Sequence, residues 1–529
     1  MKKGFLAAVL TSASVMSLVG YGGPAVFADS DQEQTTLRIM VYDRGNTTET
    51  YGSATDNYWT RWLQKEFGDP NNITLEYVAV PRSEDDKKIN TMMAAGEAPD
   101  IIFSYTGSMM NQFGVDGGLY DLTDLIDEYG PNLKKNLADS LPYGVSEGHQ
   151  WTIPAVRTQT GWQTTYIRKD WLDEVGYELQ TDENGIYHMS MDDFTDLLYK
   201  FKDLDPENQG NEMYPLGVIG AWNATQTRPI IFSYLDVASL TDEMHACYNE
   251  MFWPGYKEGV RYLNKLYNDG IIDPDFMIDT DTSYSAFKGL LTTGRVLAFG
   301  HDAAQNGPNG SVDLYEADPD AELVSFYLDN VNGEQFNRIY APTGMYIAIP
   351  TTCEHPENAI KYLDFLSIYD NAKVLQYGFE GINYKLDGNE VITITPTDEE
   401  KASSDYDYER ITCGDLMLVY NGNPYGWITS SEGMEEAQAK ANDLGAMSLK
   451  SSLVGGQADY YFQGIQTDAD KESAGIVSDP LTNLPLLISC SEDEFDDMYE
   501  KVLNDYLEAG GQEIIDQKVA LYHELEAAK

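Results

Sequence analysis

Hydrophobic and polar residues alternate along residues 37–104 in a pattern that switches between strands and helices. Residues 37–42 and 73–80 are mainly apolar or alternate with a period of two, which predicts two strands. Residues 57–67 have a period of three to four and predict a helix with an apolar face of Trp59, Trp62, Leu63 and Phe67. Residues 83–95 predict a second helix, with Ser83 as its N-cap.

The stretch TMMAAGEAPDIIFS at residues 91–104 completes this pattern. Gly96 is a suitable helix stop, because glycine adopts the left-handed conformation without steric penalty. Pro99 cannot continue a helix and favours an extended conformation at Ala98. Residues 100–104 then predict a short buried strand, since parallel strands are often apolar without a break. The order strand, helix, strand, helix, strand predicts a parallel α/β sheet with right-handed crossovers.

The rest of the chain continues to mix strands and helices. A glycine-rich loop is expected at residues 107–118, followed by an amphipathic helix at 119–129. Strands are expected at 151–155, 161–166 and 345–349, and helices at 168–175, 194–202 and 356–366. The loosely patterned, charged residues 385–412 suggest an insertion, and residues 494–526 predict a closing pair of helices.

Four segments carry a resemblance to a known family. They are MMAAGEAPDIIF at 92–103, YIRKDWLD at 166–173, KLYNDGIIDPDF at 265–276 and PENAIKYLDFL at 356–366. In this order they resemble the extracellular solute-binding proteins of ABC importers, the maltose-binding type, and within it the large Gram-positive oligosaccharide-binding lipoproteins. The resemblance implies an α/β fold of the two-lobed periplasmic-binding-protein type (class II, Venus flytrap), with hinge crossings between the lobes.

The expected division of the chain follows from this resemblance. Residues 1–28 are expected to be a signal peptide and 29–36 a tether. The first lobe is expected to comprise 37–157 plus 345–400, and the second 160–343 plus 401–529. The lobe to which individual parts of 385–529 belong stays open.

The N-terminus has the pattern of an export signal. Lys2 and Lys3 precede an apolar and small-residue run at residues 4–20. Cleavage after Ala28 would suit an ordinary signal peptidase. Residues 18–20 also resemble the start of a lipoprotein box, but Tyr21 stands where the lipid-carrying cysteine belongs. We therefore expect an extracellular protein, secreted or associated with the cell surface, either without a lipid anchor or as a variant of a lipoprotein.

Charge narrows the possible partners. Lys and Arg total 34 against 87 Asp and Glu, for a net charge of −53. A field of that sign repels nucleic acid and anionic membrane surfaces, so neither is expected as a partner. The acidity fits a well-solvated surface or an adaptation to salty or alkaline surroundings. Hydrophobic residues make up 42% of the 529 residues, which allows a large core in two or three domains.

Two apparent catalytic motifs lack the context that they need. GVSEG at residues 144–148 matches GxSxG, but a nucleophile elbow requires a preceding strand and a following helix. Pro142 lies just before it and an extended segment follows, so a hairpin turn is expected. His523 and Glu524 begin an HExxH pattern, but Ala527 replaces the second histidine. We therefore expect no enzyme activity, no cofactor and no metal centre.

The cysteines form no motif. Cys247, Cys353, Cys413 and Cys490 are far apart in sequence, with no CxxC pair. They allow three disulfide pairings, or they are isolated buried thiols that act as small hydrophobic residues.

One loop raises the question of calcium. Some members of the resembled family carry a calcium loop where this chain alternates Asp205, Glu207, Gln209 and Asn211. Later donor positions hold apolar residues instead, so both a calcium loop and a plain polar loop stay open.

Aromatic residues, 12% of the chain, are the strongest positive signal. Ligands of open α/β sheets bind beyond the carboxyl ends of the strands. Aromatic rings cover the CH faces of sugars while Asp, Asn and Arg bond to hydroxyl groups, although peptides use the same residue types. Residues of these types that follow predicted strands or flank the lobe crossings are the candidate ligand-binding residues: Asp43, Arg44, Tyr105, Arg157, Trp162, Trp222, Asn223, Tyr346 and Trp427.

Together these observations predict a solute-binding receptor of an ABC importer. It would bind a carbohydrate in a cleft between the lobes and deliver it to the permease subunits. Among carbohydrates, an oligosaccharide is the expected ligand. A monomer is expected. The alternatives are a secreted carbohydrate-active enzyme, or a peptide-binding or adhesion receptor on the same fold.

Overall fold

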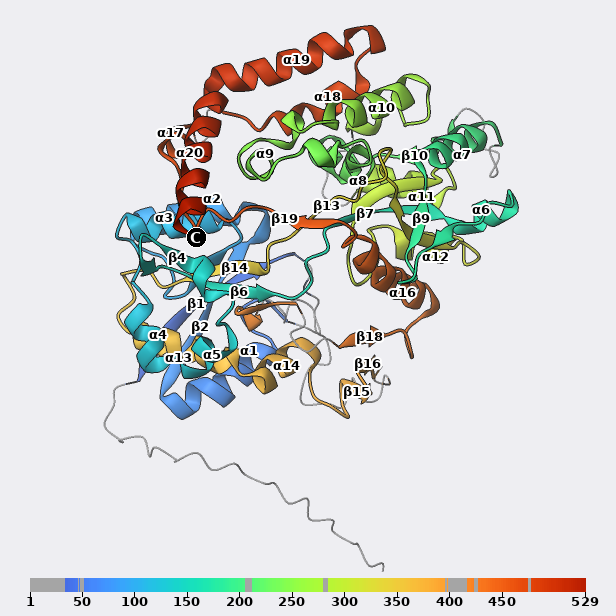
Figure 1. Cartoon of the computed structure of the whole chain (residues 1–529). Helices are drawn as coiled ribbons and strands as arrows, with labels where there is room; N and C mark the ends of the chain where they lie inside the picture. The colour runs from blue at the N-terminus through green and yellow to red at the C-terminus, as the bar shows by residue number, and fades with distance from the viewer. Residues whose placement is uncertain are drawn as a thin grey trace, which may run out of the picture.

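The computed structural model describes residues 34–45, 47, 52–204, 212–278, 284–394, 397, 416–422, 427–473 and 477–529. The expected signal peptide, the possible calcium loop at 205–211 and Cys413 lie outside these residues. Two α/β lobes lie one above the other in Figure 1. Among the described residues, no helix has the length and apolar character needed to cross a membrane.

The first lobe is built on a mixed sheet. β1 and β2 are parallel, and Ile39 of β1 forms a parallel bridge with Ile101, the residue before β3. β14 is antiparallel to both β3 and β6, so β3 and β6 run in the same direction. The resulting order is β2 (Ile73–Pro81), β1 (Thr35–Asp43), β3 (Ile102–Ser104), β14 (Thr343–Ala348), β6 (Ile153–Arg157) and β17 (Tyr420–Asn421).

One hydrophobic core surrounds this sheet. It includes Trp59 and Leu63 of the first helix, Ile89 and Met92 of the second, and Ile360 of α13. The helices of this lobe are α1 (Tyr58–Leu63), α2 (Asp85–Ala95), α3 (Gly107–Val115), α4 (Thr123–Tyr129), α5 (Pro131–Asn136), α13 (Pro356–Ser367) and α14 (Tyr369–Tyr377).

The second lobe has its own sheet and its own core. The strand order is β10 (Leu216–Gly217), β11 (Ala298–Asp302), β7 (Gln163–Arg168), β12 (Leu323–Leu328), β9 (Tyr187–Met189) and β8 (Gln180–Thr181). The helices on its side of the molecule are α6 (Lys169–Glu174), α7 (Met191–Leu204), α8 (Arg228–Phe232), α9 (Asp242–Cys247), α10 (Tyr256–Asn268), α11 (Ser285–Thr292), α12 (Ser311–Ala317), α16 (Glu436–Ser451), α18 (Leu484–Ser489) and α19 (Phe495–Tyr506). The remaining helices, α17 (Asp468–Ser473) and α20 (Gln512–Ala528), pack against each other, and α20 also packs against α9.

Short strands complete the structure. β4 (Val145–Ser146) and β5 (His149–Gln150) form a hairpin around Glu147 and Gly148, both with positive φ. This is the turn expected for the GxSxG match, because such φ values suit a two-residue hairpin loop. β13 (Asn337–Ile339) pairs with β19 (Gly456–Ala458), and β16 (Glu390–Thr393) lies between β15 (Tyr384–Asp387) and β18 (Ile428–Ser430).

Two chain segments cross between the lobes side by side. One joins β6 to β7 and the other joins β13 to β14. The Arg157 N–H donates to the Pro342 carbonyl at 2.9 Å, and the Tyr340 N–H donates to the Thr160 carbonyl at 2.8 Å. A third contact comes after β19, where the Tyr461 ring lies 4.4 Å from that of Tyr143 and its hydroxyl donates to the Tyr143 carbonyl. The paired crossings bring residues of both lobes together.

Most expected elements are present, with two corrections. Residues 107–118 are not a loop, because α3 covers Gly107–Val115; the glycines there allow close packing, and Gly114 lies against the Trp151 ring. Ser83 does not cap α2, since it lies in a 3-10 turn and the helix begins after Glu84 without a side-chain cap. Gly96 does end α2 in the left-handed conformation, with φ +69°.

Residues 416–421 belong to the first lobe, whereas the division expected from the sequence assigns all of 401–529 to the second lobe. In the structure, Leu416, Met417 and Val419 are buried in the first core, and β17 pairs with β6. The physical reason is that this stretch supplies the edge strand of the first sheet before the chain passes to α16 in the second lobe.

Asp364 of α13 holds the start of α5. Its carboxylate accepts the backbone N–H groups of Asn132 and Leu133 at 2.7 and 2.8 Å, and the Asn132 amide at 2.8 Å. Because hydrogen bonds to a charged group contribute about 1.5–3 kcal/mol, Asp364→Ala should lower the free energy of unfolding by about 2–3 kcal/mol in urea denaturation.

Asp370→Ala is the matched control. Asp370 is exposed and pairs with Lys373 only at the surface, so its loss should change stability by less than about 1 kcal/mol. Equal changes in the two variants would contradict the capping role of Asp364.

Candidate functional site

The carboxyl ends of β1, β3 and β6 meet at one edge of the first sheet. β1 and β3 run in parallel, and β6 has the same direction. Tyr42 lies at the end of β1, Tyr105 directly after β3, and Arg157 at the end of β6. This edge is where ligands of open α/β sheets bind. The three side chains begin a row of rings and guanidinium groups that continues into the second lobe.

Two stacked tyrosines form the first part of the row. The Tyr42 and Tyr105 rings are nearly parallel, with centroids 6.4 Å apart. The Arg82 guanidinium carbon lies 5.0 Å from the Tyr42 centroid and 4.9 Å from that of Tyr105, and Arg44 lies 5.5 Å from Tyr42. Cations over aromatic faces are attracted by the ring quadrupole, so these contacts order both sets of groups.

Arg157 connects the two lobes. Its guanidinium carbon lies 5.9 Å from the Tyr105 centroid and 4.2 Å from that of Tyr340, which belongs to the second crossing. Its Nε donates to the Thr343 carbonyl at 3.1 Å. Tyr340 in turn stacks on Trp162 of the first crossing, with centroids 4.7 Å apart. The crossings thus place an aromatic pair beside a cation at the junction of the lobes.

Two further arginines flank Trp162. The guanidinium carbons of Arg228 and Arg338 lie 5.1 and 5.4 Å from the Trp162 centroid. We call the whole set the arginine–aromatic row: Arg44, Tyr42, Arg82, Tyr105, Arg157, Tyr340, Trp162, Arg228 and Arg338.

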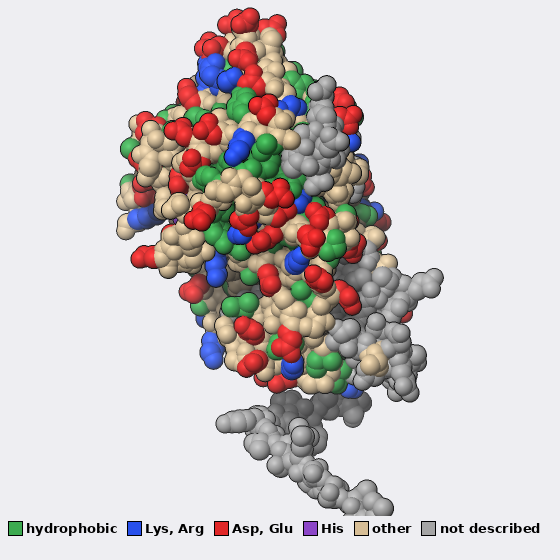
Figure 2. Space-filling model, turned by 90° about the vertical axis from the view of Figure 1, so that its right-hand side faces the viewer, with side chains coloured by type: hydrophobic (Ala, Val, Ile, Leu, Met, Phe, Trp, Pro, Cys, Tyr) green, Lys and Arg blue, Asp and Glu red, His purple; other side chains and the backbone are tan. Residues whose placement is uncertain are grey.

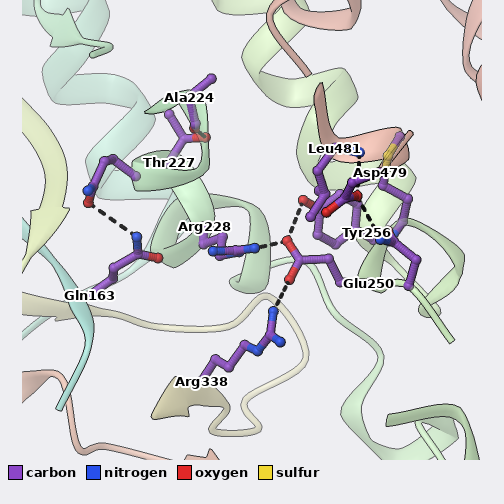
Figure 3. A network of polar contacts seen from close by, with 12 residues as sticks. Gln163, Ala224, Thr227, Arg228, Glu250, Tyr256, Arg338, Asp479 and Leu481 are labelled. Carbon is purple, nitrogen blue, oxygen red and sulfur yellow. Dashed lines mark hydrogen bonds and ion pairs between the residues drawn. The ribbon is translucent and has the colours of Figure 1, made fainter. Parts of the chain in front are cut away.

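Glu250 holds this end of the row in place (Figure 3). It is only 2% exposed, and its carboxylate accepts Arg228 Nε at 2.7 Å, Arg338 Nη1 at 2.8 Å and the Tyr256 hydroxyl at 3.0 Å. Arg338 is also bonded to Asp459. A buried charge needs such pairing, because an unpaired carboxylate away from water is very costly.

Polar groups accompany the rings of the row. Asn421 donates to the Tyr105 hydroxyl at 2.8 Å, and Gln163 donates to Asp302 at 3.2 Å. The pKa of Tyr340 is raised to about 12, mainly by burial and then by the negative charge of Asp302, while Arg157 lowers it by a smaller amount. The Tyr340 hydroxyl is therefore protonated at neutral pH and can act as a donor.

The structure brings five of the expected ligand-binding residues to this region. Arg44, Tyr105, Arg157 and Trp162 belong to the row, and Asp43 is next to Arg44, exposed and bonded to the Gly45 N–H. Tyr346 lies close to the row on β14, where its hydroxyl is 3.3 Å from that of Thr343, the residue whose carbonyl accepts Arg157 Nε. Trp427 lies 5.5 Å from the ring of Tyr377 and 6.2 Å from that of Tyr384. Trp222 and Asn223 lie in a 3-10 helix, and their side chains are outside the described part.

Sequence reasoning did not select several residues of the row. Arg82 follows β2 at the same sheet edge as the expected residues, so the rule that selected them could have found it. Tyr340 is an aromatic residue in the second crossing and gave a comparable signal. Arg228 and Arg338 gave none, since only the fold shows that they share Glu250 and flank Trp162.

Among the described residues, no group of three or more His, Cys, Asp or Glu side chains could hold a metal ion. Cys247, Cys353 and Cys490 are free and buried, as isolated thiols. Burial raises the pKa of Cys247 to about 11 and that of Cys353 to about 12, which disfavours the reactive thiolate.

Replacing Glu250 tests the anchor of the row. Glu250→Ala leaves Arg228 buried without its counter-ion, so the free energy of unfolding should fall by about 3–5 kcal/mol in urea titration. Asp127→Ala, which removes an exposed ion pair with Lys134, should cost no more than about 1 kcal/mol. A Glu250 variant as stable as this control would show that the buried pairing contributes little.

A histidine near this network makes stability depend on pH. His245 packs against Trp253 and Phe336, and its Nε2 is buried without a hydrogen-bond partner among the described residues. Burial lowers its pKa, while Asp459 raises it and Arg338 lowers it by smaller amounts. The unfolded chain, with a histidine pKa of about 6.5, therefore takes up this proton first as the pH falls.

The stability that neutral His245 supports is complete above about pH 6.5 and is lost as the pH falls through the lower pKa of the folded state. His245→Phe should therefore lose less unfolding free energy than the wild type between pH 7.5 and 5.0. His355→Gln, at a partly exposed position beside Glu357, should follow the wild type. Parallel pH profiles for wild type and His245→Phe would refute the assignment.

Known proteins are similar to this chain in sequence and in fold. The profile of the family described as bacterial extracellular solute-binding protein matches residues 48–368. The fructooligosaccharide ABC transporter substrate-binding protein FusA of Streptococcus pneumoniae is 24% identical over 314 residues, 53% of this chain and 54% of that protein. The polygalacturonan/rhamnogalacturonan-binding protein YtcQ of Bacillus subtilis is 22% identical over 473 residues, 86% of each chain.

The fold has solved counterparts. The structure of the alginate-binding protein AlgQ2 without calcium ion superposes with a TM-score of 0.63 at 16% identity, covering 93% of this chain and 98% of that one. The aligned region of our chain spans about half the length of FusA, but nearly all of AlgQ2. The expected two-lobed α/β architecture is thereby confirmed. Because the profile match covers more than half of the chain, this protein belongs to the bacterial extracellular solute-binding protein family.

Proposed function

We propose that this chain is the receptor of an ABC importer and that it binds an oligosaccharide at the arginine–aromatic row. The observation that carries the proposal is the stacked pair of Tyr340 and Trp162 at the junction of the lobes, with polar groups around it. Sugars present CH-rich faces that rings cover and hydroxyl groups that polar side chains bond. The names of FusA and YtcQ, which are both sugar-related, support the same class of ligand.

Binding would couple the ligand to the relative position of the lobes. Tyr105 belongs to the first lobe, whereas Tyr340 and Trp162 belong to the two crossings. A ligand that contacts all three would favour the conformation in which the lobes lie close together, as a shift of population. The loaded receptor would then deliver the sugar unchanged to the permease subunits, with no chemical step. Export through residues 1–28 stays a prediction, as does the location at the cell surface or in the surrounding medium.

A thermal-shift screen of the purified protein tests the proposal. The panel comprises neutral oligosaccharides, acidic oligosaccharides and peptides, followed by chromatography of the recovered ligand. A ligand at 100 times its dissociation constant should add about 2.7 kcal/mol of stability. Stabilisation by a sugar that is recovered intact is expected. Cleavage of the sugar would favour the enzyme alternative, and stabilisation by peptides alone would overturn the ligand class.

Two tyrosine variants then locate the site. Tyr340→Ala removes the ring between Arg157 and Trp162 and should weaken binding of the identified sugar by about 30-fold or more, which corresponds to an anchor residue of about 2 kcal/mol. Tyr267→Ala is the control: this tyrosine lies on α10 and bonds to the Pro274 carbonyl, with no contact to the row. Isothermal titration calorimetry that shows equal affinity for both variants would exclude the row as the binding site.

A further inference from the structure

Arginine is concentrated in the row to a degree that the composition does not predict. The chain has eleven arginines and a net charge of −53, yet five of those arginines lie in the row. Figure 2 shows how acidic side chains spread over the face that it displays, where they outnumber the basic ones. Positive charge is therefore placed at the junction of the lobes against the trend of the whole molecule.

Four of the five arginines have assigned roles or contacts. Arg228 and Arg338 share Glu250, and Arg338 also pairs with Asp459. Arg82 pairs with Asp85 at 2.9 Å, and Arg44 lies over Tyr42 at the outer end of the row. These arginines are part of the scaffold that orders the rings.

Arg157 differs from them. It is half-buried, its Nε donates to a backbone carbonyl, and within the described residues no carboxylate lies within ion-pair distance of its guanidinium group. The nearby Asp302 is bonded to Gln163 instead. A cation that is partly removed from water is normally paired, since its lost hydration must be compensated. The position of Arg157 between Tyr105 and Tyr340 thus lacks an anionic partner.

The geometry points to a carboxylated sugar, and we propose that the row binds oligosaccharides that contain uronic acid units. This inference rests on the proposed function, because the same rings would hold the sugar. A guanidinium group offers parallel N–H donors that match the two oxygens of a carboxylate. A uronic acid unit carries a CH-rich face for Tyr340 and Trp162 and a carboxylate for Arg157 on one ring.

The test compares each acidic sugar with its own neutral derivative. Wild-type protein is titrated by calorimetry with oligomers of galacturonate, mannuronate and glucuronate, and with the methyl ester of each. Esterification removes the charge and keeps the ring. We expect at least one acid to bind about 10- to 100-fold more tightly than its ester, as a charge-assisted hydrogen bond requires.

Variants assign the preference to Arg157. Arg157→Gln should reduce the affinity for the acid to that for the ester and leave the affinity for the ester nearly unchanged. Arg157→Lys, which keeps the charge but loses the paired donors, should lie between the two. Arg61→Gln, at an exposed arginine paired with Asp56, is the control and should bind like the wild type. Circular dichroism melting checks that each variant is folded. The comparison of acids with their esters uses the wild-type protein and does not depend on the folding of any variant.

The outcomes separate this inference from the proposed function. Equal affinity for acids and esters, or tight binding of neutral, sulfated or phosphorylated sugars alone, would overturn the uronate inference and keep a sugar receptor. If Arg157→Gln lowers the affinity for the acid and for the ester to the same extent, the role of Arg157 is purely structural. That result would also overturn the uronate inference. No binding of any sugar, acidic or neutral, would overturn the proposed function itself.

Discussion

A carboxylate that is taken out of water must be paired, and Glu250 meets this requirement with two arginines at once. Its oxygens accept Arg228 and Arg338, and both guanidinium groups then lie against Trp162. Burying the Glu250 carboxylate is costly unless both arginines stay in contact with it. An arginine that moved away would leave a buried ion uncompensated, so the positions of the arginines are fixed. The Trp162 ring, and Tyr340 stacked on it, therefore have a rigid support on the side of the second lobe.

The other half of the row depends on the sheet of the first lobe. Parallel direction places the ends of β1, β3 and β6 at one edge, and Tyr42, Tyr105 and Arg157 emerge there together. The two crossings begin at this same edge and are hydrogen-bonded to each other. Support for the rings thus comes from both lobes, while the contact between Arg157 and Tyr340 lies at the junction. The row therefore joins groups whose relative position would change if the lobes moved.

This arrangement favours binding over chemistry. The residues around the row are rings, arginines and amides that can hold a sugar, and the apparent serine motif is a hairpin turn with Glu147 and Gly148 at positive φ. The described thiols are buried, and burial raises the pKa values of Cys247, Cys353 and Cys490. Affinity would arise from stacking and hydrogen bonds, both of which allow the ligand to leave unchanged.

Local pattern determined much of this protein. Period-two and period-3.6 segments specified the strands and helices of residues 35–104, and Gly96 and Pro99 marked the helix end because their backbone preferences act locally. The rule for strand ends also selected Arg44 and Tyr105, and the position beside the first crossing selected Arg157 and Trp162. Only the tertiary structure decided that β17 belongs to the first sheet, that Arg228 and Arg338 flank Trp162, and that Glu250 links the two arginines. These contacts join residues as far apart in sequence as Val156 and Tyr420, and such pairings depend on how the chain packs rather than on any local sequence signal.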